Sequence, residues 1–133
     1  MGQVTEGRVL DSNILIYHIN GQLSPLMEQE IFGSLEQPTF ISVITTMEVL
    51  SWPGHSDKSI AATSALLDVF REMSLNNEIK ISAITIRRLH RLKLPDAVIA
   101  ATALHLELPL VTRNSKDFVG IPDLKLVNPF DSY

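Results

Sequence analysis

The chain has 133 residues, 45% of them hydrophobic, which is enough for a single domain with a two- or three-layer core. The absence of cysteine excludes disulfides, thiolate zinc sites and cysteine nucleophiles and permits a reducing cytoplasmic setting, while the net charge of −4 argues against a surface that is basic throughout. The first residues lack a signal-peptide pattern and no apolar run reaches the roughly 20 residues that span a bilayer, so we expect a soluble, cytoplasmic protein.

Strand-like and helix-like segments alternate along the chain. Short apolar segments predict five strands, at residues 8–10, 39–43, 73–75, 108–112 and 124–127. Helical periodicity predicts helices at residues 13–20, 24–36, 45–52, 57–71, 77–91 and 95–107. The segment at 76–92 also alternates like a strand at Ile79 and Ile81, but Ile79, Ala83 and Ile86 fit helical spacing better. The alternation predicts one α/β domain over residues 1–133 with a parallel sheet.

Acidic residues follow the predicted strands at the end where parallel sheets bind ligands. Asp11 comes directly after the first strand, and Asn114 and Asp117 follow the segment PLVT. Glu48 lies in the helix after FISVI, and Asp96 begins a helix whose segment AVIAATA has the small residues of close packing. Taken singly, Asp11 could be a helix N-cap and Asp96 a partner of the helix dipole. Together, these side chains should meet at one edge of the sheet.

Such a cluster suits a hard divalent cation. Neighbouring carboxylates repel one another, and a divalent ion offsets that repulsion. Oxygen ligands without cysteine or histidine favour Mg²⁺, with Mn²⁺ as a substitute, and these ions support phosphodiester hydrolysis with one or two metals. The spacing of the four histidines gives no metal-binding pair, so we interpret His18, His55, His90 and His105 as structural or exposed.

Four segments of the sequence resemble the PIN domain family, and within it the VapC-like toxins of toxin–antitoxin systems. They are VLDSNILIYHI, ISVITTMEVL, LKLPDAVIAATALHLELPLVTRN, and SKDF followed by LKLVNPF, in order across nearly the whole chain. The resemblance implies a five-stranded parallel sheet in the order 3-2-1-4-5 flanked by helices. It also implies a metal-dependent ribonuclease that forms a homodimer and is bound by a small antitoxin protein, whose tail often inserts a basic residue among the carboxylates.

Carried over to this sequence, the resemblance assigns the family's first three acids to Asp11, Glu48 and Asp96. At the fourth position Asn114 would be a neutral ligand and Asp117 the charged one, a departure that weakens a second metal site. Further polar residues match positions that help to orient the acids or lie by the metal; they are Asn13, Thr45 and Thr112. For Thr45, helix capping is an equal alternative.

Positive charge gathers near the proposed metal edge and could contact RNA phosphates. The candidate RNA-binding residues are Arg87, Arg88, Arg91, Lys93, Arg113 and Lys116. A solvated helix face explains such a run equally well. Aromatic side chains that could stack on bases are few, and for Tyr17, Trp52 and Phe118 we favour packing.

Three other interpretations remain. Aspartyl-phosphate phosphatases also carry an aspartate after the first strand, but they need a second acid where this chain has Asn13. A catalytically silent PIN fold could serve as an RNA- or protein-binding module, although all four acids, Asp11, Glu48, Asp96 and Asp117, are present. A housekeeping RNA-processing nuclease would use the same chemistry, and an adjacent antitoxin gene would separate that role from a toxin.

Overall fold

Five parallel strands form one sheet in the order β3-β2-β1-β4-β5 in a computed structural model, which describes residues 7–32 and 37–132. The strands are β1 (Arg8–Leu10), β2 (Thr39–Ser42), β3 (Arg71–Met73), β4 (Leu110–Val111) and β5 (Leu126–Val127). This confirms the predicted parallel α/β fold and its strand order. All carboxyl ends of the strands therefore lie at one edge of the sheet.

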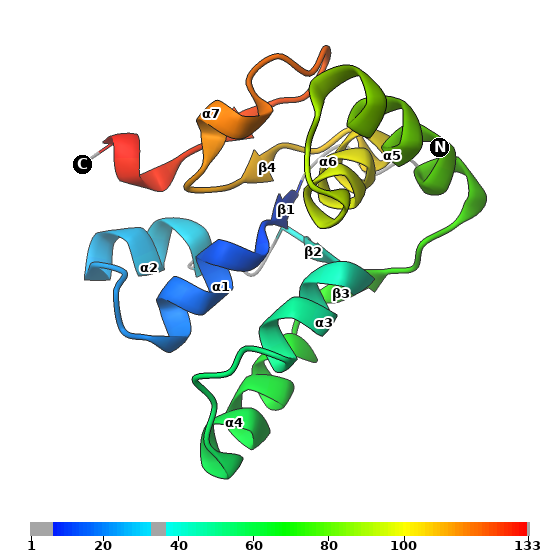
Figure 1. The fold of residues 1–133 in the computed structure, drawn as a ribbon. Helices are drawn as coiled ribbons and strands as arrows, with labels where there is room; N and C mark the ends of the chain where they lie inside the picture. Colours follow the sequence, from blue (N-terminus) through cyan, green and yellow to red (C-terminus); the bar gives the residue numbers. More distant parts are fainter. Residues whose placement is uncertain (1–6, 33–36, 133) are drawn as a thin grey trace.

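The helices of the described residues pack on both faces of this sheet (Figure 1). They are α1 (Ser12–Ile19), α2 (Pro25–Phe32), α3 (Val43–Leu50), α4 (Asp57–Leu67), α5 (Asn77–His90), α6 (Leu94–Leu106), α7 (Ser115–Phe118) and a 3-10 helix, η1 (Pro129–Ser132). Helices α5 and α6 pack against each other on one face, and α1, α2 and α4 contribute to the other (Figure 1). None of the helices within the two described ranges has the length and apolar character needed to cross a bilayer.

Alternate residues of the central strands feed two separate cores. Val9 and Leu110 pack with α5 and α6, whereas Leu10, Ile41 and Val111 pack with α1, α2 and α4. Strand side chains point alternately to opposite faces, so a sheet covered on both faces needs continuous apolar runs. This is the reason why the segments FISVI and PLVT contain hardly any polar residues.

Several element boundaries differ from the sequence prediction. The predicted helix at 57–71 ends at Leu67, and the strand predicted at 73–75 is observed at Arg71–Met73. Arg71 pairs with Phe40 of β2, and both Arg71 and Glu72 are exposed, so this edge strand lacks the apolar run that marks a buried one. Helix α3 begins at Val43 because the Ser42 hydroxyl caps it, accepting from Ile44 N. The last four positions of the helix predicted at 24–36 lie outside the described residues.

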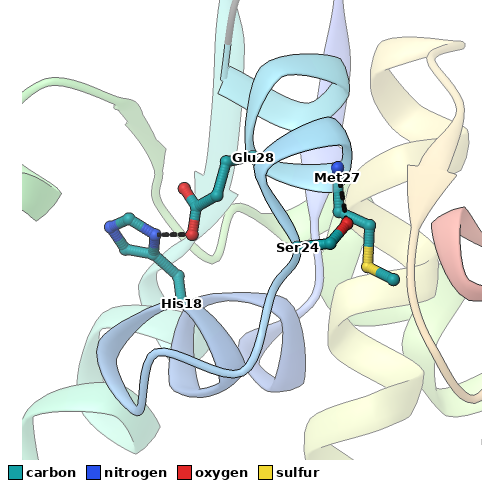
Figure 2. Close-up of polar contacts among 4 residues, drawn as sticks. All are labelled: His18, Ser24, Met27 and Glu28. Carbon is teal, nitrogen blue, oxygen red and sulfur yellow. Dashed lines mark hydrogen bonds and ion pairs between the residues drawn. The ribbon is translucent and has the colours of Figure 1, made fainter.

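Side-chain contacts fix the turn between α1 and α2 (Figure 2). His18 Nδ1 lies 2.7 Å from Glu28 Oε1 and joins the end of α1 to the first turns of α2. The Ser24 hydroxyl accepts a hydrogen bond from Met27 N at 3.1 Å, which is the arrangement of a helix N-cap. The predicted helix start at Ser24 and Pro25 is therefore confirmed, and His18 has a structural partner as expected.

Helix α6 packs closely between the sheet and α5, and its small side chains are buried in the core that they share. Ala97, Ala100, Ala101 and Ala103 are fully buried, and the buried Thr102 donates its hydroxyl hydrogen bond to Val98 O at 2.8 Å within the helix. The predicted packing role of these alanines is confirmed. Their close fit fixes the position of the first turn of α6, where Asp96 lies.

Candidate active site

The carboxyl edge of the sheet carries a cleft of about 310 Å³. It is lined by Asp11, Ser12, Asn13, Ile16, Glu48, Lys93, Pro95, Asp96, Asn114, Asp117 and Phe118. The cleft therefore contains all the acids predicted to meet, together with Asn114. They come from the residue after β1, the body of α3, the first turn of α6 and the segment after β4. Elements far apart in the sequence converge here because parallel strands end at the same edge.

Asp11 is the most buried acid of the cleft, with 4% of its surface exposed. It caps helix α1, since its Oδ1 accepts from Ser12 N at 2.7 Å. Its Oδ2 accepts from the Thr112 hydroxyl at 2.7 Å and from Asn13 Nδ2 at 3.2 Å. Asp11 is thus both the N-cap of α1 and one of the acids that line the cleft. Asn13, which was predicted to help orient the acids, and Thr112, which was predicted to lie by the metal, both contact Asp11 directly.

The pKa of Asp11 is raised to about 6. Burial is the main cause, and the negative charges of Asp96 and Glu48 add to it. The hydrogen bonds from Thr112 and from Ser12 N act in the opposite direction, because they stabilise the ionised form. A buried acid with like charges beside it is typical of functional sites.

Glu48 is held by a serine that the sequence did not single out. The Ser12 hydroxyl donates to Glu48 Oε1 at 2.7 Å and lies 3.2 Å from Thr45 Oγ1. Thr45 is fully buried, and Ser42 caps α3, so the capping alternative for Thr45 is wrong. The only sequence signal for Ser12 was its place beside Asp11, where a serine is usually part of a helix start.

Asp96 lies half-buried in the first turn of α6, next to Pro95. Its pKa is raised, first by burial and then by the charges of Glu48 and Asp117, while Lys93 partly offsets this effect. The helix N-terminus also favours an acid at this position. Asp96 thus interacts electrostatically with Asp11, Glu48 and Asp117, which links all four acids of the cleft.

The fourth corner is more open than the other three. Asn114 and Asp117 are both exposed, in the segment that leads into the short helix α7. The backbone of this segment is fixed, because Asn114 N donates to the Thr112 hydroxyl at 3.0 Å and Asn128 Nδ2 donates to Arg113 O at 2.7 Å. Asn128 is a second residue that sequence reasoning missed.

The donor set of the cleft fits a hard divalent cation with few protein ligands. Its available side-chain ligands are carboxylate, amide and hydroxyl oxygens, and no histidine lines it. Within residues 7–32 and 37–132, no three acidic or histidine side chains stand close enough together to hold one ion. Mg²⁺ satisfies this condition, since it keeps several waters and binds through one or two carboxylates.

Of the predicted RNA-binding residues, only Lys93 lines the cleft. The exposed ones at the end of α5 are Arg87, Arg88 and Arg91. Lys116 is exposed in α7, and Arg113 lies against Tyr17 and Phe130. Among the aromatic residues, Phe118 is 1% exposed, which confirms its packing role.

Comparison with known proteins identifies the family. The model of the PIN domain matches residues 8–123. The chain belongs to the PIN domain family. Its structure is similar to that of a toxin–antitoxin complex from Klebsiella pneumoniae, with 34% identity, a TM-score of 0.76, and coverage of 92% of this chain and 97% of that one. None of the curated proteins compared with the chain matches it.

Two further solved structures share this PIN fold. VapBC-1 from nontypeable Haemophilus influenzae is 25% identical, with a TM-score of 0.76 and coverage of 93% of this chain and 98% of that one. DNA-bound VapBC from Salmonella typhimurium is 22% identical, with a TM-score of 0.81 and coverage of 94% and 99%. The likeness to the Salmonella protein is one of fold alone. The sequence resemblance to PIN domains is confirmed over nearly the whole chain.

Proposed function

We propose that this PIN domain is a divalent-metal-dependent endoribonuclease, and that it is the toxin of a toxin–antitoxin pair. The observation that supports this most strongly is the convergence of Asp11, Glu48, Asp96 and Asp117 on one cleft at the carboxyl edge of the sheet. Four mutually repelling acids are costly for a fold that does not use them. The similarity to a Klebsiella chain from a toxin–antitoxin complex supports the toxin role.

In this proposal Mg²⁺ or Mn²⁺ would bind through one or two of the carboxylates of Asp11, Glu48 and Asp96 and would reach the remaining acid through its waters. Asn114 and Asp117 stand at the open corner of the cleft. When bound, the ion would offset the negative charge of the scissile phosphate and lower the pKa of the attacking water. Thr112 and Asn13 keep the Asp11 carboxylate oriented through their hydrogen bonds to Oδ2. Ser12 does the same for Glu48. Such supporting contacts typically matter for metal affinity as well as for geometry.

The proposed partners are an RNA substrate, a small antitoxin protein and a second copy of the chain. Lys93 supplies positive charge for RNA within the cleft, and the exposed arginines at the end of α5 add positive charge in the segment that leads to it. Exposed apolar side chains support the homodimer: Ile81 and Ile84 of α5 are 56% and 51% exposed, and Met47, beside Glu48 in α3, is 61% exposed. The antitoxin is supported by the complexes in which the similar chains occur.

The test is cleavage of labelled single-stranded and hairpin RNAs by the purified chain. We expect cleavage with Mg²⁺ or Mn²⁺, its loss in EDTA, and a reduction of at least about a hundredfold in Asp96→Asn, because that variant keeps the shape but loses one charged ligand. Growth arrest on expression should disappear in the same variant. Asp123→Asn is the matched control, since Asp123 is exposed, does not line the cleft, and has a positive φ of 67° that asparagine tolerates.

Cleavage that persists in Asp96→Asn or in EDTA would contradict the nuclease. RNA or protein binding without turnover under Mg²⁺ and Mn²⁺ would instead support a binding module. Turnover without growth arrest, and without an adjacent antitoxin gene, would support a housekeeping nuclease.

A further inference from the structure

Arg113 is held beside the cleft by two aromatic rings. Its guanidinium carbon lies 4.5 Å from the centroid of the Phe130 ring and 5.1 Å from that of Tyr17. The two rings also contact each other, with centroids 5.3 Å apart and planes tilted by 54°. An arginine stacked in this way has fewer conformations to lose when its N–H groups bind a ligand.

The N–H donors of the Arg113 side chain form no ion pair with an acid in the part of the chain that the structure describes. Within residues 7–32 and 37–132, the ion pairs join His18 to Glu28 and His105 to Glu78, and none involves Arg113. A guanidinium that is stacked on its face can still donate along its edges, in the fork that matches phosphate oxygens. The side chain is therefore oriented but its charge is uncompensated by any described acid.

Backbone contacts tie Arg113 to the carboxylate network. Arg113 N donates to Asn13 Oδ1 at 3.4 Å, and the amide nitrogen of the same Asn13 donates to Asp11 Oδ2. On its other side, Arg113 O accepts from Asn128 Nδ2 at 2.7 Å. The position of Arg113 relative to Asp11 is thus fixed by hydrogen bonds from both directions.

Arg113 and Lys93 lie toward opposite faces of the sheet. Tyr17 and Phe130 pack against the core formed with α1 and α2, whereas Lys93 immediately precedes α6, which packs on the other face. The acids of the cleft lie at the sheet edge between them. The acids themselves repel a polyanion such as RNA. A strand that crosses this edge would, however, meet Lys93 on one side of the acids and Arg113 on the other.

We infer that Arg113, oriented by Tyr17 and Phe130, binds a phosphate of the substrate RNA next to the scissile one, where the strand leaves the cleft toward α1. This inference rests on the proposed function, because it takes the cleft as the place of cleavage. Phe130 lies in the 3-10 helix η1 after β5, so the C-terminal segment contributes one of the two rings that orient Arg113.

The test is fluorescence anisotropy with a labelled single-stranded RNA of mixed sequence, titrated in EDTA so that binding is measured without metal-dependent cleavage. For Arg113→Ala we expect roughly tenfold weaker binding, as for the loss of one charge-assisted hydrogen-bonded contact. The slope of log affinity against log salt should shrink by about 0.7, the contribution of one phosphate contact on a single strand. Phe130→Leu should weaken binding by a smaller factor and leave the slope unchanged, because the charge is retained.

Arg71→Ala is the matched control. Arg71 also lies over an aromatic ring, that of Phe40 at 5.8 Å, but at the amino end of β3. It should leave affinity and slope as in the wild type. The inference is overturned if the slope of Arg113→Ala equals that of the wild type, if Arg71→Ala lowers the slope as much, or if the wild type binds no RNA.

Two further comparisons keep the outcomes separate. Arg113→Lys retains the positive charge but lacks the planar guanidinium that lies over the two rings, and it replaces Arg113→Ala if that variant does not fold. Its affinity for RNA should be lower than that of the wild type, while the slope of log affinity against log salt should be unchanged. Equal affinity in Arg113→Lys and the wild type would also overturn the role of the stack. If the slope shrinks in Arg113→Ala while the wild type shows no cleavage in Mg²⁺, the phosphate contact stands and the proposed nuclease function fails.

Discussion

The two ends of the sheet carry hollows of similar size and opposite character. At the amino end of β1, β2 and β3, a cavity of about 380 Å³ is lined by apolar side chains such as Phe32, Leu66 and Phe70 and by the basic residues Arg8 and Arg71. The acid that lines it, Glu28, pairs with His18. At the carboxyl end, a cleft of about 310 Å³ gathers four acids around one lysine. A concentration of acids, and not the size of the hollow, therefore distinguishes the candidate active site.

The difference between the two ends is tested most directly by neutralising one glutamate at each end. Glu48→Gln should lower the RNA cleavage rate by at least about a hundredfold, because it removes a charged ligand from the cleft. Glu28→Gln should leave the rate unchanged and lower the free energy of unfolding by less than about 1 kcal/mol, the usual effect of losing a partly exposed ion pair. Single-turnover cleavage and chemical denaturation measure the two effects. Equal rates in both variants would abolish the distinction between the two ends.

The second largest effect concerns the dependence of stability on pH. Burial raises the pKa of Asp11 from 3.8 to about 6, so the folded protein binds this proton more tightly than the unfolded chain does. The contribution of Asp11 to the free energy of unfolding therefore falls as pH rises from about 4 to about 6, and it stays low above pH 6. The difference corresponds to on the order of 3 kcal/mol.

Asp11→Asn isolates this contribution. In EDTA, its free energy of unfolding relative to the wild type should rise between pH 4 and pH 7 by on the order of 3 kcal/mol. Mg²⁺ should reduce the difference, because it stabilises only the protein that still has the charged ligand. Urea denaturation over this pH range provides the measurement. A difference in free energy of unfolding that stays constant with pH would contradict a raised pKa of Asp11 in the folded protein.

A smaller effect is expected at Thr112, whose hydroxyl is fully buried and donates to Asp11 Oδ2. Thr112→Val removes the side-chain hydrogen bond that lowers the pKa of Asp11, so that pKa should rise further. We expect about 1–2 kcal/mol lower stability, and a cleavage rate whose acid limb moves to higher pH. Thr112→Ser keeps the hydroxyl and should behave as the wild type. An unmoved pH profile in Thr112→Val would assign this residue to packing alone.

The sequence was sufficient to predict the sheet and the convergence of the acids. Both depend on where strands end, and a position just after a parallel strand lies at the carboxyl edge even when the boundary is displaced by a residue or two. Asp11 and Asn114 are examples. The displaced strand β3 shows the limit, because Arg71 and Glu72 are exposed and Met73 is its one residue packed against the core, so the strand carries little hydrophobic pattern.

The supporting contacts could not be predicted in the same way. The sequence predicts Ser12 as part of a helix start. Its hydrogen bond to Glu48 joins α1 to α3, and the relative position of these two helices is set by the tertiary structure. The stacking of Arg113 on Tyr17 and Phe130 likewise brings together three separate segments. Periodicity describes one element at a time, whereas these contacts depend on how elements meet.

The alanines of α6 give side-chain size a role in the chemistry of the cleft. Ala97, Ala100 and Ala101 are fully buried where the helix rests on the sheet, and Asp96 extends from the same helix. Methyl groups thus act as spacers that set the separation of one acid from the others. Added carbon atoms at these positions cost about 1–3 kcal/mol and lift the helix. Selection on such an enzyme therefore constrains the volume of residues that no substrate ever touches.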